Sequence, residues 1–108
     1  RTSNAAITTG SWHLFGATYS AATGGATAAN DITLYQDGAV IASTATNVGT
    51  YVAMEPHVSP IEIGTDTAHT LRFFSGSMAF ICVTQRNLSA ADHANFRVLI
   101  NNFYGLSL

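Results

Sequence analysis

This sequence has very little charge and contains no lysine. Asp, Glu and Arg make up 9% of its 108 residues, against roughly 25% charged residues in an average soluble protein. Six acidic and four basic side chains give a net charge of −2, so the chain lacks the basic stripe that releases counterions from nucleic acid. The composition therefore predicts that the chain does not bind nucleic acid.

Long apolar runs and cysteine pairs are also missing. The longest apolar run, Met78 to Val83, is far shorter than the roughly 20 residues that cross a bilayer, and the N-terminus has no charged start followed by an apolar core. We therefore expect no membrane insertion. The single cysteine, Cys82, excludes a disulfide within the chain. Because its two neighbours are apolar, we expect a buried and inert thiol.

Strand signals are what the first 85 residues do contain. Residues 11–19 alternate with apolar side chains on both faces, which predicts a strand covered on both sides. Residues 20–31 offer only small and polar side chains and predict a long surface loop. Shorter strands are expected at 50–54 and 60–64, where Ile61 and Ile63 would face inward. Residues 77–85 form the longest strand candidate, and their two apolar faces are typical of a central strand.

A β-hairpin is the clearest local signal. Ile32 and Leu34 share one face of a short strand that runs directly into Asp37-Gly38. This dipeptide fits the positive φ values of a type I′ turn, and a return strand can follow over residues 39–44. Since the turn already explains Asp37, we do not count this residue among the candidate ligands.

The apolar period changes from two residues to the helical value at Ser89. The Ser89 hydroxyl can cap a helix, and Asp92 completes an acidic variant of the capping box. The helix is expected to end near Tyr104-Gly105 and to lay one apolar stripe on the sheets. That stripe consists of Phe96, Leu99, Ile100 and Phe103.

About six short strands followed by one helix predict an all-β fold, an antiparallel β-sandwich with a C-terminal helix, in a single domain over residues 1–108. The order of the motifs resembles the laminin G-like branch of the concanavalin A-like lectin/glucanase superfamily. The motifs that carry this resemblance are Trp12-His13, Leu34 to Gly38, Ile61 to Gly64, Phe74-Ser75-Gly76 and Leu88-Ser89.

The resemblance implies a jelly-roll sandwich with Trp12 and Tyr35 in its core. The matched motifs correspond to the C-terminal part of that family's domain, so the sandwich would be incomplete within this chain. An incomplete sandwich exposes sheet edges that invite pairing. We therefore expect self-association or assembly with a missing N-terminal segment.

Catalysis is not predicted. Glucanases of this fold resemble one another in a cluster of carboxylates on one strand, because retaining glycoside hydrolysis needs two carboxyl groups about 5 Å apart. The only glutamates here are Glu55 and Glu62, and they are separated by a turn and Pro56. No Gly-x-Ser-x-Gly elbow is present either. We expect the chain not to be an enzyme.

Candidate binding residues lie in the loops. The four histidines show no spaced pair typical of zinc sites. Several laminin G-like domains bind calcium through loop aspartates, and the resemblance implies Ca²⁺ as the one candidate cofactor, although one or two aspartates fall short of its six to eight oxygens. The candidate metal ligands are Asp31 and Asp66. The candidate ligand-binding residues are Asn30, Asp31, Tyr51, Asp66, His69 and Phe73.

Three functions are compatible with these features. The first is a non-catalytic recognition or adhesion module, similar to lectins, that binds glycan or a protein partner through its loop rim. The second is a structural virion or fibre component resembling phage tail-fibre and capsid-decoration domains. The third is an accessory domain of a larger glycoside-processing enzyme. Low charge and abundant Ala, Thr, Asn and Gly favour an extracellular or virion-associated protein.

Overall fold

A computed structural model of the chain describes residues 1–50, 52, 63–65 and 73–108. The chain divides into two compact units. Arg1–Val52 and Thr84–Leu108 form the first unit, and Ala53–Val83 forms the second. Each unit is described by itself.

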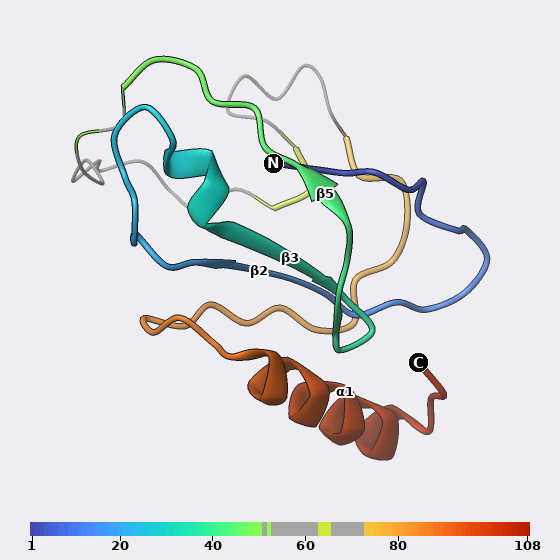
Figure 1. The fold of residues 1–108 in the computed structure, drawn as a ribbon. Helices are drawn as coiled ribbons and strands as arrows, with labels where there is room; N and C mark the ends of the chain where they lie inside the picture. Colours follow the sequence, from blue (N-terminus) through green and yellow to red (C-terminus); the bar gives the residue numbers. More distant parts are fainter. Residues whose placement is uncertain (51, 53–62, 66–72) are drawn as a thin grey trace. The chain divides into compact units, whose positions relative to one another are not determined.

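A three-stranded antiparallel sheet is the centre of the first unit (Figure 1). Its strands are β2 (Phe15–Tyr19), β3 (Ile32–Gln36) and β4 (Ala39–Val40), in the order β2-β3-β4. Pairing of Gln36 with Ala39 leaves a two-residue turn between β3 and β4. Asp37 and Gly38 have φ angles of 51° and 79°, as a type I′ turn requires. The predicted hairpin is therefore confirmed.

The return segment of the hairpin forms strands in two different sheets. It leaves β4 and continues into β5 (Ser43–Thr44), which pairs with β1 (Thr2–Ser3). Backbone hydrogen bonds follow this change of partner, because the Ile41 N–H donates to Leu34 O and the Asn4 N–H donates to Ala42 O, each at 3.0 Å. The predicted return strand over residues 39–44 is thus present, but it is divided between a three-stranded and a two-stranded sheet.

The C-terminal helix α1 (Ala90–Tyr104) has the predicted ends. The Ser89 hydroxyl accepts the Asp92 N–H at 3.2 Å, and the Asp92 carboxylate accepts the Ser89 N–H at 2.8 Å. Gly105 ends the helix with a left-handed φ of 65°. Figure 1 shows α1 on one side of β2 and β3, and β5 on the other side.

The apolar stripe of α1 is only partly buried. Ile100 is buried, and so is His93, which lies two turns earlier on the same face of the helix. The prediction that Leu99 and Phe103 also pack on the sheets is wrong, since their exposed fractions are 59% and 76%. Of the four residues of the predicted stripe, Ile100 is the buried one.

The loop over residues 20–31 ends in a short 3-10 helix, η1 (Ala28–Asp31). The predicted surface loop is confirmed for most of this segment, which exposes small and polar side chains. Asp31 departs from the prediction because it is buried at the junction with β3.

Three predicted core positions are exposed. Trp12 lies before β2, outside any strand, and nearly half of its side-chain surface is accessible. Ile63 and Cys82 are exposed in the second unit. The structure assigns no strand to residues 73–83, so the predicted central strand over 77–85 is wrong for this part of the chain. A strand exists only beside a hydrogen-bonding neighbour, and none of the strands in the described residues pairs with this segment.

The described residues therefore form two small antiparallel sheets and one C-terminal helix. The strands predicted at 50–54 and 60–64 lie almost wholly outside the described residues. Where the structure describes the chain, no helix has the length and the apolar character needed to cross a membrane.

Candidate functional site

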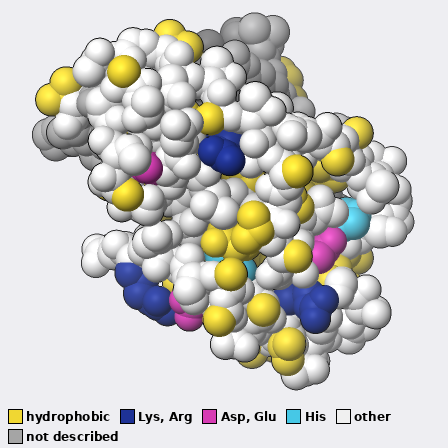
Figure 2. Space-filling model, in the orientation of Figure 1, with side chains coloured by type: hydrophobic (Ala, Val, Ile, Leu, Met, Phe, Trp, Pro, Cys, Tyr) yellow, Lys and Arg dark blue, Asp and Glu magenta, His cyan; other side chains and the backbone are white. Residues whose placement is uncertain are grey.

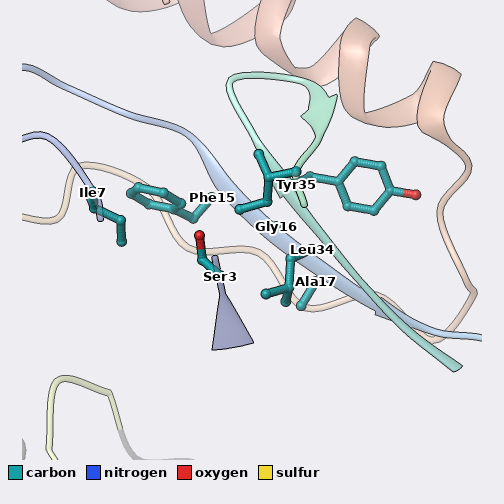
Figure 3. A pocket seen from close by; sticks show the side chains of 8 residues that line it. Ser3, Ile7, Phe15, Gly16, Ala17, Leu34 and Tyr35 are labelled. Atoms are coloured by element: carbon teal, nitrogen blue, oxygen red, sulfur yellow. The ribbon is translucent and has the colours of Figure 1, made fainter. Parts of the chain in front are cut away.

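An apolar groove lies between the two sheets of the first unit. Its volume is about 350 Å³. Side chains alternate across β2 and β3, so that Phe15, Ala17 and Leu34 line the groove while Tyr35 points toward α1 (Figure 3). Ser3 of β1 and Ile7 form the opposite border. The groove is a surface for an apolar group, and its lining contains no charged side chain.

The loop over residues 20–31 is held in shape by the carboxylate of Asp31. Its Oδ2 atom accepts the backbone N–H groups of Thr23 and Gly24 at 2.7 and 3.0 Å, and its Oδ1 atom accepts the Thr23 hydroxyl at 2.9 Å. The hydrogen bond from the Gly24 backbone, with those from Thr23, outweighs burial and lowers the pKa of Asp31. The ionised carboxylate therefore acts as an internal anchor for the loop.

Further polar contacts join this loop to its neighbours. Asn47 Oδ1 accepts the Ala29 N–H at 2.8 Å, and Asn47 Nδ2 donates to Asn30 Oδ1 at 3.2 Å. On the same loop, the Arg1 guanidinium donates to Asn30 O at 3.4 Å and to the Ser43 hydroxyl at 2.7 Å. We call residues 20–31 together with Arg1, Ser43 and Asn47 the polar rim. The polar rim presents amide, hydroxyl and guanidinium groups, and the hydrogen bonds of Asp31, Asn47 and Arg1 hold its backbone in place.

A second polar cluster holds the segment before β2 against the hairpin turn. The Asp37 carboxylate accepts the Leu14 N–H at 2.9 Å through Oδ1 and lies 2.9 Å from His13 Nδ1 through Oδ2. His13 Nε2 lies 3.0 Å from the Thr8 hydroxyl. Burial raises the pKa of Asp37, but the hydrogen bonds from Leu14, His13 and Gln36 outweigh it, so the pKa is lowered overall.

A hydroxyl, an imidazole and a carboxylate in this order also form nucleophilic triads. Here the second carboxylate oxygen is taken by a backbone N–H, and the whole set joins residues 8–14 to the β3–β4 turn. We therefore assign the cluster a structural role. Sequence reasoning explained Asp37 by the turn alone and missed its pairing with His13, because nothing local links residues that are 24 positions apart.

On the opposite face of the sheet, His93 packs on Tyr35. The two rings are stacked, with centroids 3.7 Å apart and an angle of 14° between their planes. Both side chains are buried, with exposed fractions of 8% and 6%. His93 lies within the predicted helix, but the predicted apolar stripe did not include it. The available signal was its spacing from Phe96 and Ile100, which matches a helical face.

The predicted ligand-binding residues have different locations. Asn30 is exposed on the polar rim, and Asp31 is buried beneath it. Phe73 belongs to the second unit and is exposed. Tyr51, Asp66 and His69 lie outside the described residues. Among the predicted residues that the structure describes, Asn30 and Asp31 lie together as neighbours in the chain.

The described residues do not fit a calcium site. Calcium needs six to eight oxygen ligands, whereas the Asp31 oxygens face hydrogen-bond donors of their own loop. In the part of the chain that the structure describes, no three His, Cys, Asp or Glu side chains lie together in a way that could hold a metal ion. Asp66, the second predicted ligand, is not among the described residues.

The surface electrostatics are weak, as the composition requires. Figure 2 shows few charged side chains on the face in view, and hydrophobic side chains scattered among the backbone and the uncharged polar residues. Such a surface does not attract a highly charged ligand over long distances. It suits a ligand recognised by hydrogen bonds or by apolar contact.

Comparisons with protein-family models, with curated proteins and with solved structures find no match for this chain.

Proposed function

We propose that this chain is a non-catalytic recognition or adhesion module, extracellular or virion-associated, and that its fold is a laminin G-like jelly-roll sandwich of the concanavalin A type. Two antiparallel sheets that border one apolar groove support the sandwich, because two packed sheets bury such a surface between them. The motif order of the sequence supports the family. The second half of the sandwich would come from an N-terminal segment or from another chain.

The polar rim is the binding surface in this proposal, and its anchoring by Asp31 and Asn47 is the observation that carries it. Because hydrogen bonds from Asp31 and Asn47 already hold this loop, it loses little conformational entropy when a ligand binds. The exposed amide of Asn30 and the neighbouring hydroxyl groups can donate to and accept from the hydroxyl groups of a sugar or the backbone of a peptide. Glycan or an uncharged protein loop therefore suits this surface.

A glycan array with and without calcium tests the proposal. We expect binding that the double variant Asn30→Ala/Asn47→Ala abolishes. Asn102→Ala is the matched control, because Asn102 is an exposed asparagine on α1, away from the rim. A folded protein that stays silent across the array and toward candidate protein partners would contradict the recognition function.

A structural role in a virion or fibre is the second candidate, and the open groove favours it. Phe15 and Ile7 expose about half of their surface at its border, and apolar surface of this kind is normally covered by a neighbouring subunit. Light scattering of the purified chain tests this role. We expect oligomers, and a monodisperse, folded monomer over a range of concentrations would argue against assembly.

An accessory role beside a glycoside-processing enzyme is a third candidate. The two carboxylates of glycoside hydrolysis would then lie outside residues 1–108. The coding sequence upstream of Arg1 decides between the candidates, since a catalytic domain, a fibre domain and a secretory signal each favour a different one.

A further inference from the structure

Helix α1 is attached to the sheet through a histidine that is buried in its neutral form. The His93 ring lies flat on the Tyr35 ring and directly above the backbone of Gly16 on β2. An ideal Cβ atom at Gly16 would lie 2.5 Å from His93 Cε1 and 2.8 Å from Nδ1. Non-bonded atoms do not approach so closely, so the imidazole fits only because residue 16 has no side chain.

The site favours the neutral imidazole over the charged one. Among the described residues, no atom makes a hydrogen bond to the buried Nε2 atom of His93. Loss of hydration on burial lowers the pKa of His93, and the charge of Asp92 offsets only part of this effect. A protonated ring carries an N–H donor at Nε2 as well as at Nδ1, and Nε2 gains an acceptor or water when the ring leaves the sheet.

The other titratable groups on the surrounding elements do not change this picture. Tyr35 on β3 presents its ring face, and Asp37 in the β3–β4 turn is paired with His13. On α1 itself, the Asp92 carboxylate is held by Arg86 and by the N-cap. Tyr19 on β2, and Arg97 and Tyr104 on α1, complete the set of titratable groups on these elements.

Helix α1 also contacts the hairpin. Gly38 in the hairpin turn lies against the helix backbone at Ala94, where an added Cβ would be 3.1 Å from the Ala94 Cα. Ile100 is the only other buried residue of the helix. With Leu99 and Phe103 exposed, His93 and Ile100 are the two residues of α1 that are buried.

We propose that His93 is an acid-sensitive lock, and that protonation of its ring releases α1 from β2 and β3 and uncovers the face of the sheet around Tyr35. The direction follows from linkage, because a group that binds its proton more readily in the released state favours that state as the pH falls. The ratio of attached to released helix falls by up to about tenfold for each pH unit below the ordinary histidine pKa of 6.5. The device is independent of what the polar rim binds.

Hydrogen exchange of the whole chain between about pH 7.5 and about pH 5 tests the lock, with rates corrected for the intrinsic pH dependence of exchange. We expect the protection of residues 90–104 to fall in this range while that of β3 is retained. In His93→Phe the ring can still stack on Tyr35 but cannot be protonated, so protection of the helix should stay constant. The other three histidines are unchanged in this variant and serve as an internal control.

A second measurement needs no variant. The ring protons of His93, followed by NMR during the same titration, should show a midpoint below 6.5 together with the loss of helix protection. A midpoint at or above the ordinary value would overturn the proposal. Parallel loss of protection in the wild-type chain and in His93→Phe would overturn it as well, since acid would then act on another group.

Discussion

Gly16→Ala is the substitution that tests the contact between β2 and α1 most directly. Gly16 lies in the strand and faces His93. A Cβ at 2.5 Å from Cε1 forces the ring to withdraw by about 1 Å before ordinary contact distance is restored. That movement separates the imidazole from Tyr35, on which it is stacked at 3.7 Å.

Two opposing effects determine the size of the change. Forced overpacking of a well-fitted site costs about 1–3 kcal/mol. Replacing glycine by alanine in a strand otherwise stabilises by about 0.5–1 kcal/mol, because the unfolded chain loses conformational freedom. We expect Gly16→Ala to lower the free energy of unfolding by about 1–2 kcal/mol. In a His93→Ala background nothing opposes the new methyl group, and the same substitution should stabilise by about 0.5–1 kcal/mol.

Urea unfolding of the four chains of this double-mutant cycle, followed by circular dichroism at neutral pH, measures both values. The expected reversal of sign corresponds to a coupling of about 2 kcal/mol between residues 16 and 93. Gly10→Ala is a matched control, because its φ is +90° and no atom lies within 4 Å of the added Cβ. Its cost should be equal in both backgrounds. A stabilising Gly16→Ala in the wild-type chain, or equal effects with and without His93, would refute the close approach.

Two substitutions and one labelling experiment test other parts of the structure. Asp37→Asn keeps a side chain that tolerates positive φ but removes the charge, and should lower the free energy of unfolding by about 1–2 kcal/mol near neutral pH, measured by urea unfolding. Because the pKa of Asp37 is lowered in the folded chain, the stabilisation by its carboxylate is lost as the pH falls through that pKa. The variant should therefore lose less stability on acidification than the wild-type chain. Equal acid sensitivity of both chains would contradict this. Ser89→Ala removes the N-cap acceptor and should lower stability by about 1 kcal/mol, and an unchanged thermal midpoint would show that the cap is unimportant. The exposed Cys82 thiol should react fully with a thiol reagent in the native protein, whereas labelling that needs denaturant would show that it is covered.

The sequence predicted best those features that depend on adjacent residues. Asp37-Gly38 favours one turn geometry whatever surrounds it, and the structure has that turn. Ser89 and Asp92 satisfy each other across one helical turn, and Gly105 ends the helix because it adopts a left-handed φ at little cost. Such interactions are complete within a few residues, so the sequence is sufficient to predict them.

Burial was predicted less well because it depends on what covers a side chain. The alternation in residues 77–85 shows which side chains could share a face, but it cannot supply the neighbouring strands that would bury them. Trp12 has the apolar character of a core residue and is still half exposed. In the candidate site, Asn30 was predicted on the exposed loop, whereas the inward carboxylate of Asp31 depends on donors seven and eight residues away.

The passage of residues 39–44 from one sheet to the other has a consequence for cooperativity. A two-stranded ribbon such as β1–β5 is barely stable alone, and a three-stranded sheet of this length is only somewhat better. The same short segment bonds first to β3 and then to β1, and only Ile41 and Ala42 separate β4 from β5. Opening of either sheet therefore disturbs the other. The two sheets should therefore unfold as one unit. The hydrogen bond between the Arg1 guanidinium and Ser43 should be lost in the same transition as the hairpin.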